Sequence, residues 1–436
     1  MERPQPTAAP APTVVVAMHD GFFGSGTGAG FANDAFLRTL VGLLDPGVRL
    51  VVLPIRLADD SPERRAEWHA RSTALCAGAG ATVRPVDNGT HGRTRFGGVD
   101  AFACAARDTA TALRDEILPG ASQLAVVLFD VPFAGVAAQL PPQLCTRIAL
   151  VPRSTGLLHD VGNSARIAYE SAGMRTLAEA GGRIAAISAY MRNHLRADYR
   201  LPDAALCDLP DGLTATDWRP PDVAPPPLPR AALAGFLFAY GRAQPYKGWD
   251  DLLDALALLR DRGTTLPHSV LAAVSDQPGV TDYQRHLAAR VDALGLDGTL
   301  LTAFHPGMRG LLGHPALRAV VVPSRTEPFG RVPLEAYAAG GGPVVATTAG
   351  GLAEQVVDGV TGFTAAPEDP PALAEALGSA LAMDDRARTR MRDAGHELAR
   401  TRFDHSAAIL RFFGDFAPWA TSSAARRAVV PSVVAP

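Results

Sequence analysis

The sequence predicts an α/β protein built from two doubly wound domains. Short apolar runs alternate with longer helical patterns along the chain, which is typical of parallel sheets covered by helices on both faces. The 436 residues also exceed the ~250–300 residues at which a single hydrophobic core stops growing. A proline-rich segment, residues 219–230, separates the two halves. Together these observations predict two sheets in separate domains.

Each half of the chain contributes its own strands. In the first half, the predicted strands are residues 14–18, 48–54, 81–86, 124–130, 147–151 and 183–187. In the second half, they are residues 234–239, 269–274, 300–304, 319–323 and 344–346. Doubly wound sheets bind their ligands at the carboxyl ends of the strands. We therefore expect the two domains to face a central cleft with these edges.

The domain boundaries follow from the composition of the segments between the strands. Residues 219–230 are predicted to link the domains, because their prolines stiffen the backbone and cannot join a strand ladder. We expect a disordered tail over 1–12, an N-terminal domain over 13–218 and a C-terminal domain over 231–404. Residues 405–418 are predicted to form a helix that packs back on the N-terminal domain, followed by a frayed tail over 419–436.

The composition excludes several classes of protein. With 47% hydrophobic residues, 19% charged residues and a formal net charge of -3, the chain has no excess of positive charge for nucleic acid. Its 4 cysteines lie far apart without a Cys-x-x-Cys pair, which predicts neither a zinc framework nor disulfides. No apolar stretch approaches the ~20 residues that span a bilayer. We therefore expect a cytoplasmic protein with no nucleic-acid partner and no stable membrane association.

The segment 240–248 is predicted to bind phosphate. It follows an apolar strand and precedes a helix, where free amides and the helix dipole favour an anion. It contains Lys247, the only lysine among the 41 lysine and arginine residues. Arg242 can donate two parallel hydrogen bonds while Lys247 supplies a compact charge, so the pair suits a diphosphate. The alternative is that Lys247 is merely left over in an arginine-rich composition.

Two glutamates mark the segment 321–340. Glu327 lies in a loop after a strand, and Glu335 lies in the first turn of a helix that begins near Pro333. The two oxygens of an ionised carboxylate can accept hydrogen bonds from neighbouring hydroxyls of a ribose or a hexose. Glu335 alone could equally be an acidic residue that complements the helix dipole. Its spacing from Glu327 favours a functional role instead. The amides expected to remain free for phosphate belong to Phe329, Gly330, Arg331 and Val332.

These motifs resemble those of glycosyltransferase family 4. The resemblance rests on Gly241-Arg242 with Lys247-Gly248, on Glu327 and Glu335 with seven residues between them, and on the Gly350-Gly351 turn. Segments 188–191, 210–220 and 357–363 are also similar to that family. The resemblance implies the GT-B fold with two Rossmann-like domains. It also implies transfer of a sugar from a nucleoside-diphosphate sugar with retention of anomeric configuration. It covers about residues 183–412.

The resemblance also implies roles in the donor site. Arg242 and Lys247 would neutralise the donor diphosphate, and Glu335 would hold the ribose. Glu327 would hold the donor sugar together with the amides of residues 329 and 330, which makes Glu327, Arg242 and Lys247 the catalytic candidates. If a double displacement operated, Glu327 could be the nucleophile. The sequence has no Asp-x-Asp element, and we expect catalysis without a metal or a bound cofactor, the nucleoside-diphosphate sugar being a co-substrate.

The loop over 19–30 is glycine-rich, so its backbone can approach a phosphate or a sugar closely. The resemblance implies a glycine that touches the donor diphosphate here, and its counterpart is Gly28 or Gly30. Residues 24–29 also match the pattern G-x-G-x-x-A formally. A nicotinamide-binding protein would need an acidic residue at the end of the second strand, where this chain has Pro54-Ile55-Arg56. We therefore disfavour a dinucleotide site.

Candidate acceptor-binding residues lie in the first half of the chain. His19 and Asp20 occupy the carboxyl end of the first strand, and His159 lies in the loop after strand 147–151. Each could orient an acceptor nucleophile, although His19 and Asp20 would also fit a surface turn. A helix face that could meet a membrane, but is better explained as solvated, carries Arg64, Arg65, Trp68 and Arg71.

The resemblance gives the function that we expect. It implies a retaining glycosyltransferase that acts on a small soluble acceptor, in the biosynthesis of an actinobacterial specialised metabolite such as an antibiotic or a thiol. A disaccharide synthase or phosphorylase with the same fold is one alternative. A protein that binds a nucleotide sugar without turnover is another.

Overall fold

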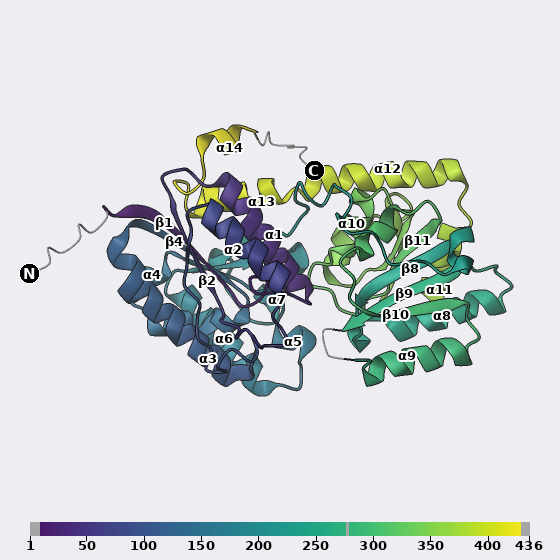
Figure 1. The fold of residues 1–436 in the computed structure, drawn as a ribbon, viewed down its shortest axis with the longest axis horizontal. Helices are drawn as coiled ribbons and strands as arrows, with labels where there is room; N and C mark the ends of the chain where they lie inside the picture. Colours follow the sequence, from purple (N-terminus) through teal and green to yellow (C-terminus); the bar gives the residue numbers. More distant parts are fainter. Residues whose placement is uncertain (1–8, 276–278, 429–436) are drawn as a thin grey trace, which may run out of the picture. The chain divides into compact units, whose positions relative to one another are not determined.

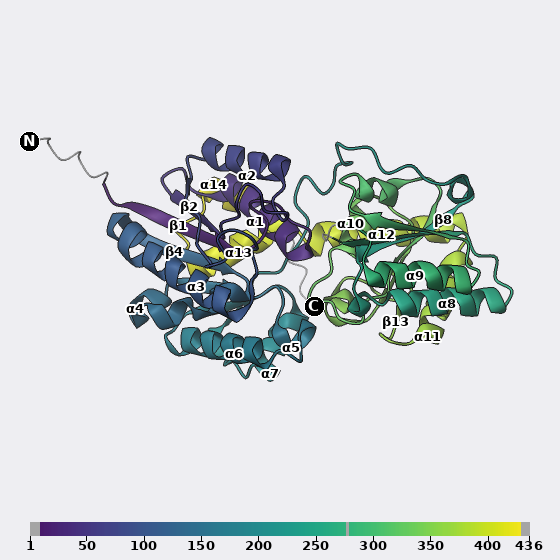
Figure 2. The same ribbon diagram turned by 60° about the horizontal axis from the view of Figure 1, so that its bottom comes forward.

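The computed structural model describes residues 9–275 and 279–428, and their internal contacts divide them into two units. Unit 1 comprises residues 9–187, 192–210 and 406–428. Unit 2 comprises residues 188–191, 211–275 and 279–405. Each unit is built around one parallel sheet with helices on both faces (Figures 1 and 2).

The sheet of unit 1 has 7 strands in the order β3-β2-β1-β4-β5-β6-β7. The central strands are buried apolar runs, because helices cover both faces of the sheet. The strands are β1 (Ala11–Met18), β2 (Arg49–Pro54), β3 (Thr82–Val83), β4 (Ala121–Phe129), β5 (Ile148–Val151), β6 (Arg183–Ala186) and β7 (Leu206–Asp208).

Helices α1 and α2 cover one face of this sheet, and α3 and α6 cover the other (Figures 1 and 2). Thr27 starts α1, because its side chain accepts a hydrogen bond from the Gly30 amide at 3.1 Å. All or most of each of the following helices belongs to unit 1: α1 (Gly28–Leu43), α2 (Ala66–Gly78), α3 (Gly98–Thr111), α4 (Pro142–Cys145), α5 (Gly156–His159), α6 (Ser164–Glu179), α7 (Ala189–Ala197), α13 (His405–Phe416) and α14 (Ser423–Ala428).

The central strands of unit 1 end at one level, which brings the loops after them together. β1 pairs with β4 so that Met18 lies opposite Phe129, and β4 pairs with β5 so that Phe129 lies opposite Val151. His19 and Asp130, which directly follow β1 and β4, therefore share the carboxyl edge of the sheet.

Unit 2 repeats this design with 6 parallel strands in the order β10-β9-β8-β11-β12-β13. The strands are β8 (Phe236–Arg242), β9 (His268–Ser275), β10 (Gly298–Ala303), β11 (Leu317–Val322), β12 (Val344–Thr347) and β13 (Gly362–Ala365). The helices are α8 (Trp249–Asp261), α9 (Asp282–Ala293), α10 (Val332–Ala338), α11 (Pro370–Leu381) and α12 (Asp385–Arg402). Helices α8, α9 and α11 lie on one face of the sheet, and α10 and α12 lie on the other (Figure 1).

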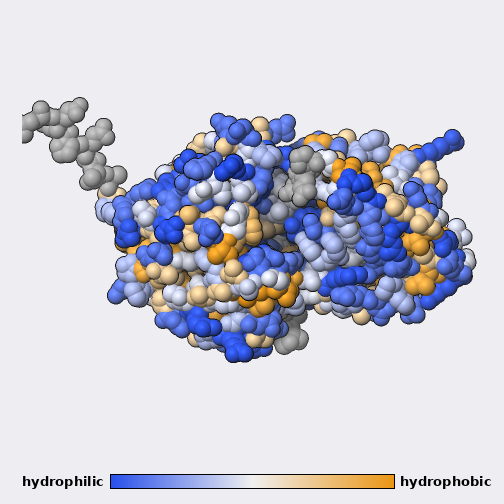
Figure 3. Space-filling model, turned by 90° about the horizontal axis from the view of Figure 1, so that it is seen from below, coloured by the Kyte–Doolittle hydropathy of each residue, from blue (hydrophilic) through white to orange (hydrophobic). Residues whose placement is uncertain are grey.

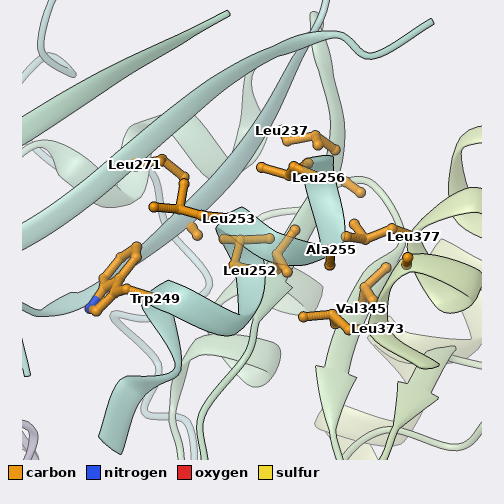
Figure 4. Close-up of a cluster of buried hydrophobic side chains, with 14 of the residues drawn as sticks. Leu237, Trp249, Leu252, Leu253, Ala255, Leu256, Leu271, Val345, Leu373 and Leu377 are labelled. Atoms are coloured by element: carbon orange, nitrogen blue, oxygen red, sulfur yellow. The ribbon is translucent and has the colours of Figure 1, made fainter. Parts of the chain in front are cut away.

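A leucine-rich core fixes α8 against the sheet of unit 2. Leu252, Leu253 and Leu256 recur at helical spacing along α8 and are almost fully buried. They pack with side chains of the sheet and of α11, among them Leu237, Leu271, Val345, Leu373 and Leu377 (Figure 4). Because α8 follows Lys247 directly, this core also fixes the loop that carries the lysine.

The predicted fold class is confirmed for both units, and each predicted strand has a counterpart in the structure. The bounds differ most at the predicted strand 81–86, of which only β3 remains. Strands β7 and β13 were not predicted, because neither is a continuous buried apolar run.

The two predicted tails are partly wrong. Strand β1 begins at Ala11, so residues 11 and 12 belong to the sheet, while residues 1–8 lie outside the described residues. Near the other end, Thr421 is buried and forms a backbone bridge with Leu44, and α14 follows. Residues 419–428 are therefore ordered, because they pack on unit 1, and only 429–436 of the predicted frayed tail lie outside the described residues.

The proline-rich segment 219–230 lies within unit 2 rather than between the units. The chain passes from unit 1 to unit 2 between Pro210 and Asp211, which corrects the predicted boundary. The backbone of Ala224 lies so close to Gly307 that a Cβ at the glycine would clash with it. The prolines therefore stiffen a segment that packs along its own unit.

The surface gives little support to a membrane-facing helix. No helix in the described ranges is long and apolar enough to cross a bilayer. Exposed apolar side chains occur in small groups on a mostly hydrophilic face (Figure 3). On α2, Trp68 is buried and its indole Nε1 donates to the Gly21 carbonyl at 2.8 Å. Arg64 binds the Leu57 carbonyl at 3.1 Å and Asp59 at 3.0 Å. Trp68 and Arg64 therefore make internal contacts, while Arg65 and Arg71 are exposed.

Candidate functional site

An ion pair joins two loops at the carboxyl edge of the sheet of unit 2. Lys247 ends the short turn Pro245–Lys247 after β8, and Glu327 lies in the loop between β11 and α10. Because β8 and β11 are neighbours, both loops leave the same edge. The Lys247 Nζ donates to Glu327 Oε2, and Ser324 Oγ donates to the same oxygen at 3.3 Å. Two of the three predicted catalytic side chains are therefore in contact, with 19% and 14% of their side-chain surface exposed.

Glycines hold these loops at close range. Gly248 has a φ of 70°, and a Cβ there would clash with the Pro323 carbonyl. Gly350 has a φ of 54°, and a Cβ there would clash with the Glu327 carbonyl. The Gly351 amide donates to that carbonyl at 2.9 Å. The Gly350-Gly351 turn therefore fixes the backbone of Glu327.

Arg242 and Lys247 lie over one aromatic ring. The guanidinium carbon of Arg242 is 5.6 Å, and the ammonium nitrogen of Lys247 is 5.7 Å, from the centre of the Tyr246 ring. In the described part of the chain, the Arg242 guanidinium has no hydrogen bond or ion pair. Its backbone is fixed, because Trp249 Nε1 donates to the Arg242 carbonyl at 2.8 Å. Arg242 beside Gly241 therefore presents a positive charge that an anion can use.

The loop after Glu327 offers a series of backbone donors. The amides of residues 329–332 make no hydrogen bond with any residue in the described ranges. Gly330 has a φ of 83°, a conformation that favours glycine. Gln355 Nε2 donates to the Phe329 carbonyl at 2.7 Å and fixes the loop from behind. Phe329, Gly330, Arg331 and Val332 can therefore donate to phosphate or sugar oxygens beside Glu327.

Glu335 is buried in a network of internal partners. Only 8% of its surface is exposed. Tyr240 donates its hydroxyl to Oε2, and Arg331 Nε donates to Oε1 at 3.2 Å. Arg309 Nε lies 3.8 Å from Oε2. Burial and the charge of Glu335 raise the pKa of Tyr240 well above its usual range, so the phenol remains a donor. A ribose that binds Glu335 has to share the carboxylate with these partners.

A second buried carboxylate completes this network. Asp217 pairs with Arg331 Nη2 and with Arg309 Nη1, each at 3.1 Å. The amide and the hydroxyl of Thr214 donate to Asp217 Oδ2 at 2.7 and 2.8 Å. Burial alone would raise the pKa of Asp217, but the two arginines and the Thr214 hydrogen bonds outweigh burial and lower it to about 2.

We expect Asp217 to contribute to stability in a pH-dependent way. Because its pKa is lowered from 3.8 to about 2, the ionised carboxylate stabilises the fold above pH 4, and this contribution is lost as the pH falls toward 2. The shift corresponds to roughly 2 kcal/mol of unfolding free energy at neutral pH. Urea unfolding of the wild type and of Asp217→Asn should differ more at pH 7 than at pH 3. An equal difference at both values would contradict this account.

In unit 1, Asp20 organises the loop after β1. Its Oδ1 accepts from the Gly21 amide at 2.8 Å and pairs with Arg95. Its Oδ2 accepts from the hydroxyls of Ser25 and Thr27 at 3.0 and 2.6 Å. With 3% of its surface exposed, the carboxylate shapes this loop and has little capacity left for the acceptor contact that was predicted.

The two glycines at the start of α1 have different surroundings. A Cβ at Gly30 would clash with the side chains of Ser25 and Asp20, so packing requires a glycine there. A Cβ at Gly28 would meet nothing within 4 Å. Of the two predicted phosphate contacts, Gly28 therefore leaves more room for a ligand.

The two predicted histidines lie at the carboxyl edge of unit 1. His19 Nε2 is 3.8 Å from Asp130 Oδ2, so the two strand ends bring an imidazole and a carboxylate together. His159 is the last residue of α5, and its amide donates to the Thr155 carbonyl at 3.1 Å. The sequence analysis did not select Asp130, although its place at the end of a predicted strand could have indicated it.

The partners of Glu335 were also missed. Tyr240 could have been selected from the sequence. It ends the apolar part of β8, where the predicted strand meets the phosphate-binding segment. Asp217 had none, because its contacts with Arg309 and Arg331 span 92 and 114 residues of chain. No group of three or more His, Cys, Asp or Glu that could hold a metal ion occurs among residues 9–275 and 279–428.

Residues 232–398 match the sequence model of the family described as "Glycosyl transferases group 1". The D-inositol 3-phosphate glycosyltransferase of Frankia alni is 36% identical over 207 residues, which are 46% of this chain and 50% of that protein. The enzyme of the same name from Streptomyces griseus is 40% identical over 154 residues, 35% of this chain and 32% of that protein. A glycogen synthase of Mycobacterium tuberculosis is 39% identical over 175 residues, 39% of each chain. The matches thus span half or less of these curated relatives.

Solved structures match nearly the whole chain. Sucrose-phosphate synthase from Thermosynechococcus elongatus has a TM-score of 0.70 at 18% identity, covering 93% of this chain and 98% of that one. Anabaena HepE in complex with UDP-glucose has a TM-score of 0.63 at 17% identity, covering 93% and 99%. This likeness confirms the predicted GT-B fold with its two Rossmann-like units. Together with the family match, it supports a GT-B glycosyltransferase.

Proposed function

We propose that this chain transfers a sugar from a nucleoside-diphosphate sugar to a small soluble acceptor. The observation that carries the proposal is the contact between Lys247 and Glu327, with the unpaired charge of Arg242 beside it. A cation pair and a carboxylate at one sheet edge suit a ligand that joins a diphosphate to a sugar.

Arg242 and Lys247 would bind the diphosphate. The negative charge of this group grows as the bond between the phosphate oxygen and the anomeric carbon breaks. A fixed positive charge therefore stabilises the transition state more than the ground state, and this difference accelerates the reaction. The amides of residues 329–332 would add backbone donors without adding charge.

Glu327 would bind the hydroxyls of the donor sugar, and Glu335 those of the ribose. The diphosphate would compete with Glu327 for the Lys247 ammonium, which frees Glu327 Oε2 for the sugar. Arg331 and Tyr240 hold the Glu335 carboxylate in one orientation, so it needs little reorganisation to meet two neighbouring hydroxyls.

The finer features of the proposal follow from the resemblance to glycosyltransferase family 4. They are transfer with retention, catalysis without a metal or a bound cofactor, a cytoplasmic location and a role in actinobacterial specialised metabolism. Two relatives, from Frankia alni and Streptomyces griseus, bear the name D-inositol 3-phosphate glycosyltransferase, which supports a small polar acceptor. The acceptor is therefore proposed to be a small polar molecule with no nucleic acid or membrane involved.

The proposed function is tested by release of nucleoside diphosphate. The purified chain is incubated in a chelator with UDP-glucose, GDP-glucose, ADP-glucose or dTDP-glucose, with and without inositol 3-phosphate and a panel of small alcohols and thiols. We expect one donor to give a glycoside product and its nucleoside diphosphate. The anomeric proton signal of the product tests retention. The proposal fails if the wild type consumes none of the four donors and either binds all four nucleotides or binds none of them.

Two other functions give different products in the same assay. A disaccharide phosphorylase would release a sugar phosphate when orthophosphate is added. A non-catalytic sensor would bind one donor tightly and leave it intact. Glu327 in contact with Lys247 favours the transferase over the sensor, because binding the nucleotide alone does not require a carboxylate against the diphosphate-binding lysine.

A further inference from the structure

A cavity of about 550 Å³ lies in unit 1, between the edge strand β7 and helix α13. Binding sites for small molecules measure ~300–1,000 Å³, so the β7–α13 cavity has the size of such a site. Every residue that lines it belongs to unit 1, and none of them is among the predicted donor or acceptor residues. Sugar transfer as proposed above therefore leaves this cavity without a role.

One wall of the β7–α13 cavity is aromatic. Ala408, Phe412 and Phe416 recur every four residues along α13, so they lie on one face of the helix. The rings of Phe412 and Phe416 have centroids 5.2 Å apart and are tilted by 32° to each other. Phe412 is buried, whereas Phe416 is partly exposed. This face gives a flat apolar molecule a surface on which to pack.

Strand β7 adds further apolar groups to the lining. Leu206 is buried, and Cys207 is partly buried beside it. Burial raises the pKa of the Cys207 thiol to about 12, so the thiol is neutral at physiological pH. With 3 residues, β7 is too short an edge to hold an added peptide strand by a ladder of hydrogen bonds. The lining therefore favours a small molecule over a peptide.

Arginines stand beside these apolar groups. Arg192 Nη1 pairs with Asp208 Oδ1 at 2.9 Å, so these two charges offset each other. Arg183 has no ion pair in the described part of the chain. Its Nη1 donates to the Ala204 carbonyl at 2.7 Å, which leaves other donors of the guanidinium free for a ligand.

Arg411 and Asp415 lie four residues apart on α13 but do not pair with each other. Both residues are exposed, and neither side chain has a hydrogen bond or an ion pair with any residue in the ranges 9–275 and 279–428. An arginine that precedes its acidic partner by four residues is the less favourable order for a helix pair. With Arg183, the cavity thus has two unpaired positive charges and one unpaired negative charge.

We propose that the β7–α13 cavity binds a small aromatic carboxylate. Its ring packs on the two phenylalanines of α13, and its carboxylate pairs with Arg183 and Arg411. A guanidinium matches the geometry of a carboxylate and can donate two hydrogen bonds to it. One negative charge also matches the excess of one positive charge, whereas Asp415 would repel a doubly charged phosphate more strongly. The proposal goes beyond sugar transfer and does not depend on it.

The test uses three probes that share a naphthalene ring and differ in charge. They are 2-naphthoate, the neutral 2-naphthalenemethanol and the cationic 2-naphthylmethylamine. Isothermal titration measures the affinity of the whole chain for each probe at neutral pH. The titration with naphthoate is repeated in the presence of UDP, GDP and ADP, which reports whether the probe shares a site with a nucleotide.

Three variants locate the bound probe. Arg411→Gln removes one exposed charge, Arg183→Gln combined with it removes both unpaired arginines, and Phe416→Ala removes part of the aromatic wall. The matched control is Arg175→Gln, because Arg175 is an exposed arginine of the same unit that lies on α6 and does not line the cavity. Thermal unfolding of each variant shows that it is folded.

We expect the wild type to bind naphthoate roughly tenfold more tightly than the alcohol and to bind the amine most weakly. Arg411→Gln should lower the affinity for naphthoate about fivefold, since solvent screens an exposed charge. The double variant should bind the acid and the alcohol equally. Phe416→Ala should weaken both by the same factor, because the ring contributes packing and no charge. The control should match the wild type, and the nucleotides should not displace naphthoate.

The proposal is wrong if the wild type binds none of the probes or binds all three equally. It is also wrong if a nucleotide displaces naphthoate, because the probe would then occupy a nucleotide site. Unchanged naphthoate affinity in the double variant would likewise place the probe elsewhere. Failure of the proposed function would appear only as missing sugar transfer and would leave these affinities as they are.

Discussion

Replacing Lys247 with alanine is expected to weaken the binding of the nucleoside diphosphate by roughly ten- to a hundredfold, because a hydrogen bond to a charged group contributes ~1.5–3 kcal/mol. The turnover should fall as well, since the lost charge would stabilise the leaving diphosphate. Both quantities are accessible by isothermal titration with the diphosphate and by steady-state release of the diphosphate from its sugar.

Lys247→Arg provides the matched control for this variant. It keeps the positive charge that Lys247 places against Glu327. Arginine is also the residue at every other lysine or arginine position of this chain. A compact ammonium and a planar guanidinium bind oxygens with different geometry, so we expect most of the affinity and less of the turnover to remain. Wild-type affinity and rate in Lys247→Ala would show that the lysine does not contact the donor.

Replacing Glu327 with glutamine is expected to tighten the binding of the bare nucleoside diphosphate and to lower the turnover about 100-fold or more. The carboxylate engages the Lys247 ammonium, so it competes with the diphosphate for the same charge. Glutamine keeps the shape of the side chain but no longer competes for the ammonium. The binding free energy of the diphosphate should therefore improve by ~1–3 kcal/mol at this partly buried site. It also removes the negative charge beside the donor sugar.

Two further variants separate this effect from general damage. Glu335→Gln should weaken nucleotide binding, the opposite sign to Glu327→Gln, because no lysine competes there and Arg331 loses one of its two ionic partners. In the background of Lys247→Ala, Glu327→Gln should no longer tighten binding, because the competition has gone. Weaker diphosphate binding in Glu327→Gln itself would mean that Glu327 supports the diphosphate rather than competing with it.

The fold could be predicted from the sequence because its strands are continuous apolar runs. Strands buried on both faces, such as β1 and β4, cannot be mistaken for surface segments. The predicted linker was misplaced because its position depends on contacts with distant residues. Prolines indicate a stiff segment, but whether residues 219–230 pack on a domain depends on distant partners such as Gly307, which no local pattern reveals.

In the candidate site, too, local patterns could be predicted and contacts between distant residues could not. Lys247, Glu327 and the glycines around them could be predicted because each stands at a strand end or a helix start. The contact between Lys247 and Glu327 spans 80 residues and required the structure. The pairing of Asp217 with Arg331 spans 114 residues, and it decides how much of Glu335 is free for a ligand. Local sequence therefore indicates which groups reach the sheet edge, and tertiary packing decides which of them already have partners.

If the loops around Lys247 and Glu327 bind a nucleoside diphosphate, such a ligand should stabilise the fold. Thermal unfolding of the wild type and of Lys247→Ala with UDP, GDP, ADP, CDP, dTDP and NAD, in a chelator, tests it most directly. A ligand at 100 times its dissociation constant stabilises a fold by about 2.7 kcal/mol. The account predicts that one nucleoside diphosphate raises the transition of the wild type and that the shift shrinks in the variant. A shift with NAD alone, or an equal shift in both proteins, would contradict it.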